Sequence, residues 1–245
     1  MAGRTFATGD VHGDLEALLR VEAQWPELDE GDTLVFVGDY VDRGSQSAQV
    51  VEHIRSLPER TSAQVVALRG NHEDGWLRVV DHGWPEFVMP EGHGCRETME
   101  SYLGPTEGSL DQQLMRVMMT GAFLPLDVLQ WFRRLPLFYE DEHAIYVHAG
   151  LPLEDGEFSH PSQVSIPAAL LWHRDQAFFR TYRGKRVVFG HTVTGYLPEE
   201  LSSYTPEDPS DMWAGPCTIG LDTGCGKGGF LTTLEMPSMT VYESR

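Results

Sequence analysis

Short apolar runs alternate with amphipathic stretches along the first part of the chain. Unbroken apolar runs predict buried strands, and apolar residues spaced three and four apart predict helices. The first strands are expected at 5–8, 33–37 and 65–68. Helices are expected between them at 14–24, where Asp14 is a plausible N-cap, and at 46–57. This alternation predicts an α/β (α+β) fold.

The pattern changes after the third strand. Residues 73–135 have mostly helical spacing with Gly and Pro breaks, which predicts a helical insertion over one face of the domain. Further strands are expected at 144–147, 186–189, 218–221, 229–235 and 239–243. No linker or internal repeat divides the chain, so residues 1–245 are predicted to form one domain.

Composition narrows the class of partner. Hydrophobic residues make up 41% of the chain, which is typical of a globular protein. Lys and Arg number 18 against 37 Asp and Glu, giving a net charge of −19. This balance argues against a nucleic-acid partner and an anionic membrane surface. A phosphorylated substrate stays compatible, because bound metal ions create a local positive site.

The cysteines and the first residues of the chain indicate where in the cell the protein is expected. The chain has three cysteines, and no apolar stretch approaches the length of a membrane span. No apolar signal segment follows Met1. We therefore expect a cytoplasmic protein without a disulfide framework.

Several apolar runs end in residues that bind metals. In open α/β sheets, the ligand site lies beyond the carboxyl ends of the strands, so such residues meet although they are distant in sequence. Carboxylate, amide and imidazole ligands without a thiolate suit Mn, Fe, Zn or Co. The candidate metal ligands are Asp10, His12, Asp39, Asn71, His148 and His191.

Five short motifs surround these residues. They are Gly-Asp-Val-His-Gly at 9–13, Gly-Asp-Tyr-Val-Asp-Arg-Gly at 38–44, Gly-Asn-His-Glu at 70–73, His-Ala-Gly at 148–150 and Gly-His-Thr at 190–192. Together they resemble the signatures of PPP-type serine/threonine phosphoprotein phosphatases, in the compact bacterial and phage branch of the calcineurin-like metallophosphoesterases. The resemblance implies a β-sandwich of mixed sheets flanked by helices, with a helical cap.

The resemblance also implies two divalent metal ions, with Mn expected and Fe, Zn, Co or Ni as alternatives. By position, Asp10 and His12 would hold the first ion. Asp39 would bridge both ions, and the second would be completed by Asn71, His148 and His191. Such a pair activates a bridging water for direct attack on phosphorus.

The remaining motif residues match the family's catalytic positions. Arg43 would bind phosphate oxygens, and His72 would protonate the leaving alkoxide. Asp42 would orient His72. The segment Leu-Trp-His-Arg at 171–174 resembles one that supplies a second phosphate-binding arginine, here Arg174.

Other polar residues receive simpler interpretations. Asp222 is interpreted as part of a structural turn near the site, and Cys217 and Cys225 as buried packing residues. The unassigned histidines are expected to be solvated or locally hydrogen-bonded: His53, His82, His93, His143, His160 and His173. Whether His173 or Asp222 contributes to the site is left open.

Substrate class is the main open question. The chain lacks the Ser-Ala-Pro-Asn-Tyr-Cys loop of the eukaryotic phosphatases. The favoured hypothesis is a phosphomonoesterase acting on phosphoserine and phosphothreonine in proteins. The alternative is a symmetrical dinucleoside polyphosphate hydrolase, whose members have an ending related to Leu-Asp-Thr-Gly-Cys at 221–225. A nucleic-acid end phosphatase is disfavoured by charge, and an inactive binding module by the complete ligand set. The segments 73–135 and 197–216 are expected to shape substrate choice.

Overall fold

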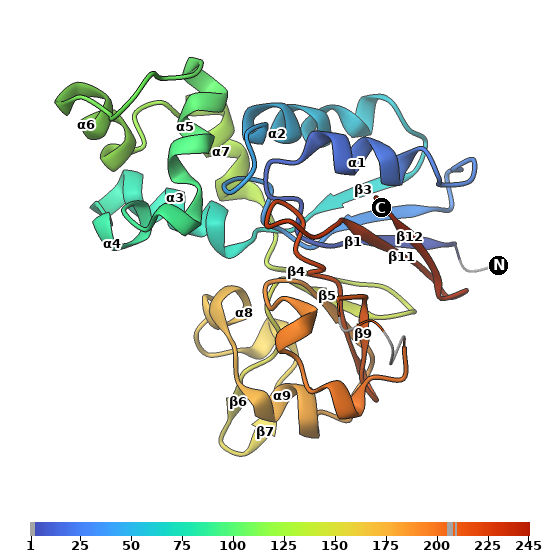
Figure 1. Cartoon of the computed structure of the whole chain (residues 1–245). Coiled ribbons are helices and arrows are strands. Elements are labelled where there is room, and N and C mark those ends of the chain that lie inside the picture. Colours follow the sequence, from blue (N-terminus) through green and yellow to red (C-terminus); the bar gives the residue numbers. More distant parts are fainter. Residues whose placement is uncertain (1–2, 205–207, 209) are drawn as a thin grey trace.

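A computed structural model describes residues 3–204, 208 and 210–245 (Figure 1). One sheet has the strand order β12-β11-β1-β2-β3. Its strands are β1 (Thr5–Thr8), β2 (Thr33–Phe36), β3 (Gln64–Ala67), β11 (Thr232–Met236) and β12 (Thr240–Glu243). The strands β1, β2 and β3 are parallel to one another. On the other side of β1, β11 pairs antiparallel with β1, and β12 pairs antiparallel with β11. The expected strand at 5–8 has these bounds in the structure.

A second mixed sheet has the order β4-β5-β8-β10-β9. Its strands are β4 (Phe138–Glu140), β5 (Ile145–Val147), β8 (Val187–Phe189), β9 (Trp213–Ala214) and β10 (Thr218–Gly220). The strands β5, β8 and β10 are parallel, and β4 and β9 pair antiparallel at the two edges. A separate hairpin joins β6 (Leu153–Glu154) to β7 (Glu157–Phe158).

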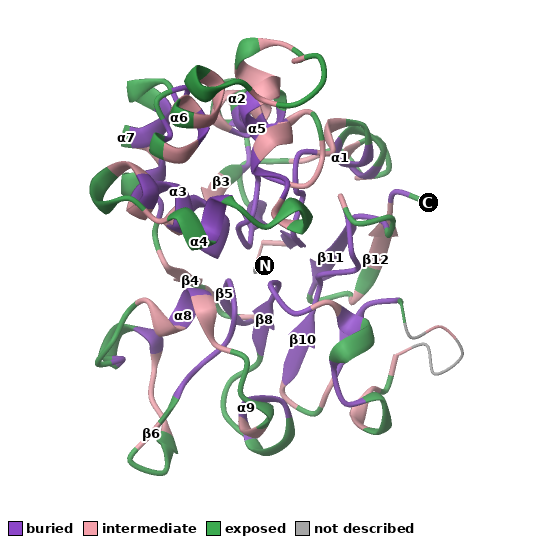
Figure 2. Cartoon of the chain, turned by 60° about the vertical axis from the view of Figure 1, so that its left-hand side comes forward, coloured by how far each residue is buried: buried purple, intermediate pink, exposed green. Residues whose placement is uncertain are grey.

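Side-chain alternation along the strands explains the layers. In β1, Phe6 packs with the helices α1 (Leu15–Glu22) and α2 (Ser47–Ser56), while Ala7 faces the second sheet. In the second sheet, Tyr146 and Val188 face inward. Its outer face packs against α8 (Ala169–Trp172) and α9 (Gln176–Thr181). The strands β1, β2, β5, β8, β10 and β11 are buried, whereas β3, β4 and β12 are partly exposed (Figure 2). The arrangement confirms the expected sandwich of mixed sheets flanked by helices.

The predicted insertion is helical. It contains α3 (Asn71–His82), α4 (Pro85–Val88), α5 (Cys95–Leu103), α6 (Gln112–Thr120) and α7 (Leu126–Arg134). These helices gather beside α2 at one end of the first sheet (Figure 1). Their core includes Trp76, whose ring meets the rings of Phe87 and Phe123 edge-on. No described helix is long and apolar enough to cross a membrane.

The structure corrects the expected elements mainly at their ends. The helix expected at 14–24 is α1, shorter by a few residues, with Asp14 accepting a hydrogen bond from the Ala17 N–H as its N-cap. The strand expected at 229–235 begins only at Thr232. The short strands β4, β6, β7 and β9 were not anticipated, because β4, β6 and β7 each include a glutamate and β9 has only two residues, whereas β5 and β8 are unbroken apolar runs. Within the predicted loop 197–216, residues 205–207 and 209 lie outside the described part of the chain.

Candidate metal centre and active site

The candidate ligands follow strands of both sheets. Asp10 and His12 follow β1, Asp39 follows β2, and Asn71 opens α3 after β3. From the other sheet come His148, after β5, and His191, after β8. The site therefore lies where the two sheets present their carboxyl ends, as expected for parallel strands. Five non-glycine residues here adopt positive φ: His12 (46°), Asp39 (56°), Asp42 (72°), Arg43 (69°) and His191 (63°).

Asp39 lies between two potential ligand sets. His12, Asp39 and His72 form one set, and Asp39, His148 and His191 form the other; within each set the ligand atoms lie within 4.8 Å of one another. Asp39 Oδ2 is 3.5 Å from His12 Nε2, and Asp39 Oδ1 is 3.4 Å from His148 Nε2. The two carboxylate oxygens thus face opposite partners, which is the arrangement a bridging ligand needs.

Hydrogen bonds to backbone carbonyls fix which imidazole nitrogens are available. Nδ1 of His12 lies 3.0 Å from the Val41 carbonyl oxygen, so it carries the proton and leaves an Nε2 lone pair. His148 Nδ1 donates in the same way to Val37 O, at 2.9 Å. His148 Nε2 then faces the amide oxygen of Asn71 at 2.9 Å, so that two acceptors meet.

A bound cation would resolve this juxtaposition of acceptors. Among the described residues, the buried Nε2 atoms of His12 and His191 also have no hydrogen-bond partner. Asn71 Oδ1 lies 2.7 Å from His191 Nδ1 as well. Buried polar atoms without partners are rare in proteins. The residues present therefore fit divalent metal ions, although Asp10 is not in either set of three and instead accepts from the His191 N–H at 2.9 Å.

The pKa directions agree with ligand chemistry. Burial lowers the pKa values of His12, His148 and His191, which favours the neutral form that binds metals. Burial opposes ionisation of Asp39, but the facing histidines outweigh it and lower the pKa of that carboxyl. Burial, then the charges of Asp222 and Asp39, raise the pKa of Asp10. This excess of buried negative charge would be relieved by cations.

His72 and Asp42 form a buried pair beside the cluster. His72 Nδ1 lies 2.6 Å from Asp42 Oδ2, and His72 Nε2 lies 3.9 Å from Asp39 Oδ2. Burial opposes protonation of His72, but Asp39 and Asp42 outweigh it and raise the pKa of the imidazole. The second oxygen of Asp42 accepts from Trp76 Nε1 at 2.9 Å and from Thr98 Oγ1 at 2.6 Å. The helical insertion thus positions this pair through α3 and α5.

The sequence did not indicate that three further residues organise the site, although Glu73 belongs to the motif at 70–73 and Trp76 was expected in the core or cap. Glu73 is buried and accepts from the backbone N–H groups of Asp39, Tyr40 and Gly70 at 2.8–3.0 Å. Its place three residues after Gly70, at the start of a helix, was a usable signal, because Glu there often caps a helix. Trp76 and Thr98 gave no such signal, since their contacts with Asp42 depend on tertiary packing.

The two predicted arginines lie on different sides. Arg43 is half-buried, and its Nη1 donates to Gly92 O at 2.5 Å. Arg174 is exposed, and its Nη1 lies 3.5 Å from Thr192 Oγ1, next to His191. Its positive charge contributes to the lowered pKa of His191. Both arginines thus border the cluster. Arg43 lies on the side of His12, and Arg174 lies on the side of His191.

The other sequence interpretations have mixed outcomes. Asp222 is buried, accepts from the Gly224 N–H at 3.1 Å and pairs with Lys227 at 3.2 Å, as in a structural turn. Cys225 is buried, but Cys217 is only half-buried because it lies where β10 begins. Most of the six unassigned histidines have local partners: His53 bonds Glu22, His93 bonds Phe87 O, His143 bonds Gly3 O and His160 bonds Glu140. His82 is exposed, and His173 is half-buried with no partner for Nε2 among the described residues.

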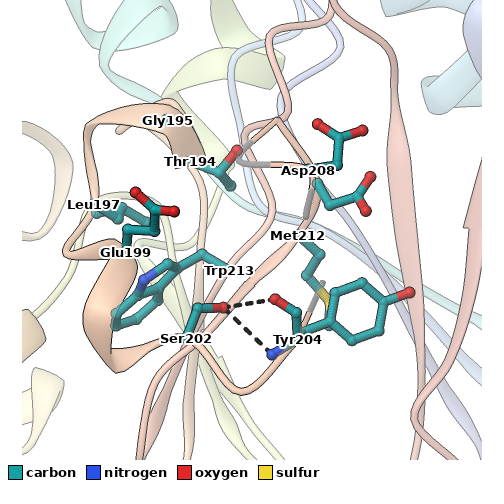
Figure 3. A pocket seen from close by; sticks show the side chains of 10 residues that line it. Thr194, Gly195, Leu197, Glu199, Ser202, Tyr204, Asp208, Met212 and Trp213 are labelled. Carbon is teal, nitrogen blue, oxygen red and sulfur yellow. Dashed lines mark hydrogen bonds between the residues drawn. The ribbon is translucent and has the colours of Figure 1, made fainter. Parts of the chain in front are cut away.

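A separate small cavity lies in the segment after His191. It has a volume of about 50 Å³ and is lined by residues including Leu197, Tyr204, Met212 and Trp213 (Figure 3). That space is large enough for a few water molecules. None of the predicted ligands or catalytic residues lines it.

Comparisons with known proteins show the family of this chain. A family model described as calcineurin-like phosphoesterase matches residues 3–195. A symmetrical bis(5'-nucleosyl)-tetraphosphatase of Marinomonas sp. (strain MWYL1) is 31% identical over 60% of this chain, but the match spans only 44% of that protein. The asymmetrical bis(5'-nucleosyl)-tetraphosphatase PrpE of Geobacillus sp. (strain WCH70) is 29% identical over 94% of this chain and 89% of its own.

A solved structure supports the fold. The crystal structure of a cold-active protein-tyrosine phosphatase from a psychrophilic Shewanella sp. has a TM-score of 0.56 and 18% identity. The similarity covers 100% of this chain and 81% of that one. With the family model matching residues 3–195, the chain belongs to the calcineurin-like phosphoesterases.

Proposed function

We propose that the protein is a two-metal phosphoesterase that hydrolyses dinucleoside polyphosphates such as diadenosine tetraphosphate. The observation that carries the phosphoesterase chemistry is the His72–Asp42 pair beside a buried cluster whose acceptor atoms face one another. The PrpE relative, a bis(5'-nucleosyl)-tetraphosphatase similar over 94% of this chain, favours this substrate class. For this reason we place the dinucleotide substrate before the phosphoprotein substrate that the sequence motifs favoured.

Two divalent ions, Mn²⁺ in this proposal, would supply the Lewis acidity that activates water and neutralises phosphate charge. Asp39 would hold both ions, because its two oxygens face opposite ligand sets. The other ligands would be Asp10 and His12 on one side, and Asn71, His148 and His191 on the other.

The remaining residues would bind phosphate and move a proton. Arg43 and Arg174 would hold non-bridging oxygens of the scissile phosphate from two sides. Asp42 accepts a hydrogen bond from His72 Nδ1–H, so the protonated imidazole presents its Nε2–H toward the cluster. His72 would transfer that proton to the leaving oxygen as the P–O bond breaks.

A phosphoserine or phosphothreonine monoester is the second candidate, and the His72–Asp42 pair itself favours it. A serine or threonine alkoxide is a far stronger base than a nucleotide phosphate, so its departure depends more on a general acid. A buried acid with a raised pKa is what that leaving group requires.

The test compares kcat/KM for diadenosine tetraphosphate and for a phosphothreonine peptide in one Mn²⁺-loaded preparation. The proposal expects the higher value for the dinucleotide. A higher value for the peptide would replace the proposal by the second candidate, and no turnover of either would exclude both. The variant His72→Asn, prepared in parallel, should lose activity, which excludes a contaminating phosphatase.

A further inference from the structure

The loop between α4 and α5 packs directly onto Arg43. It includes a short 3-10 turn, Glu91–His93, and runs from α4 toward α5 along an exposed path (Figure 2). Gly92 O accepts the hydrogen bond from Arg43 Nη1 at 2.5 Å. Gly94 has a φ of +75°, and a Cβ there would lie 2.0 Å from Arg43 N. The backbone contact therefore requires glycine at this position.

His93 lies between these two glycines and is anchored at one nitrogen. Its Nδ1 lies 2.7 Å from Phe87 O, and a carbonyl oxygen accepts only, so Nδ1 carries a proton. Its ring centroid is 5.9 Å from that of His72 and 5.5 Å from that of Phe87. Phe87 also contacts His72, with ring centroids 5.6 Å apart. The His93 ring is thus held beside the proposed acid.

The other ring nitrogen of His93, Nε2, forms no hydrogen bond with the described residues. The side chain is half-buried. It lies on the loop that holds Arg43, which would bind the scissile phosphate. A polar atom held in place without a partner, next to the acid and the phosphate-binding arginine, is available to a substrate.

We propose that His93, carrying a proton on both ring nitrogens, donates a hydrogen bond from Nε2–H to the leaving-group phosphate of a phosphoanhydride substrate. This inference rests on the proposed function, because only an anhydride places a second phosphate there. When His72 protonates a leaving oxygen that belongs to a phosphate, the other oxygens of that phosphate lie within reach of the neighbouring groups. In a serine, threonine or aryl ester, the leaving oxygen is bonded to carbon, and no anionic group stands beside it. His93 is therefore a specificity-determining residue for anhydrides over monoesters.

Two variants separate this role from a structural one. In His93→Asn, the side-chain amide can still donate to Phe87 O, while the Nε2 position is lost. In His93→Gln, the amide reaches about as far as Nε2, while the anchor is lost. The matched control is His82→Asn, at an exposed histidine at the end of α3.

The assays use Mn²⁺-loaded full-length protein with diadenosine tetraphosphate and p-nitrophenyl phosphate. His93→Asn should lower kcat/KM for the dinucleotide roughly 10-fold, mostly through KM, as expected for one lost hydrogen bond to a charged group. Its kcat/KM for the aryl ester should stay within about twofold of the wild type, and His93→Gln should recover part of the dinucleotide loss. Equal losses on both substrates, or no loss on either, would overturn the inference.

A second measurement keeps the inference testable if the proposed function fails. If the wild type cleaves the aryl ester but not the dinucleotide, the proposed function is wrong. Inhibition of aryl-ester hydrolysis by ADP and by orthophosphate, in excess Mn²⁺, then decides about His93. Weaker ADP inhibition in His93→Asn, with unchanged orthophosphate inhibition, would support a second phosphate contact. Unchanged inhibition by both would exclude it.

Discussion

Glu73 carries a buried carboxyl group that joins the two loops of the candidate site. Burial, together with the charge of Asp39, raises its pKa to about 7, although three backbone N–H groups bond to it. In Glu73→Gln, the amide NH₂ would face a backbone N–H, which leaves a buried donor unsatisfied. We expect a loss of about 1–3 kcal/mol in the free energy of unfolding.

Thermal unfolding and metal analysis would test the Glu73→Gln prediction. Metal occupancy should also fall, because the backbone of Asp39 loses its support. Glu86, exposed at the start of α4, offers a matched control in Glu86→Gln. Wild-type stability and full metal occupancy in Glu73→Gln would show that the carboxylate does not organise the site.

The proposed acid His72, which is hydrogen-bonded to Asp42, gives a second prediction for a single residue. His72→Asn removes the proposed acid but none of the six proposed metal ligands. Turnover of a phosphomonoester should fall roughly 10²–10⁴-fold, with metal content unchanged. The loss should be smaller for an anhydride, whose leaving phosphate needs a proton less. Near-wild-type turnover of the monoester would assign the acid to another group.

At the scale of the elements, an ion pair joins the starts of β1 and β2. Arg4 Nε and Nη2 donate to the buried carboxyl of Asp32 at 2.9 and 2.5 Å, and the Asp29 N–H donates to it at 2.9 Å. Burial opposes ionisation of Asp32, but these hydrogen bonds outweigh it and lower the pKa of the carboxyl. Its charged form therefore stabilises the folded state.

A variant of this ion pair gives a pH-dependent prediction. The folded pKa of Asp32 lies below the unfolded value of about 3.9, so its stabilisation is present above that pH and is lost as the pH falls through the folded pKa. Asp32→Asn should cost about 1–3 kcal/mol near pH 7, and the cost should shrink at acid pH. Urea unfolding at several pH values would measure it, with Glu16→Gln as an exposed control. A cost that does not change with pH would contradict the prediction.

The elements also show how far the sequence could predict this molecule. The strands β1, β2 and β3 and the polar residues after them were predictable, because each apolar run is unbroken and ends in a motif. The short edge strands β4 and β9 were not, because tertiary pairing rather than local pattern creates them. The gathering of the ligand residues was predictable from strand ends, whereas the contacts of Trp76 and Thr98 with Asp42 depend on how the insertion packs.

For the whole molecule, the site connects the two sheets. The first sheet supplies Asp39 and its neighbours, and the second supplies His148 and His191. Metal ions bound there would hold the sheets together, so chelation should destabilise the protein as a whole. For each ion present at about 100 times its Kd, the loss is about 2.7 kcal/mol, or a fall of about 5–10 °C in Tm per ion for a chain of this size.

Calorimetry with and without a chelator would measure this change. Asp39→Ala, which lacks the proposed bridging ligand, should unfold at the same temperature in both conditions. A wild-type Tm that does not change when the metal is removed would mean that the ions do not hold the sheets together.

The positive φ angles at the site have a consequence for how related proteins evolve. His12, Asp39, Asp42, Arg43 and His191 occupy backbone conformations that cost a non-glycine residue about 1–2 kcal/mol each. Glycine at any of them would relieve that cost and remove a proposed ligand or catalytic group. In a lineage that no longer bound metal ions, the stabilisation by those ions would already be lost, and glycine at His12, Arg43 or His191 could then recover part of it. An inactive descendant should be recognisable by glycines at these positions.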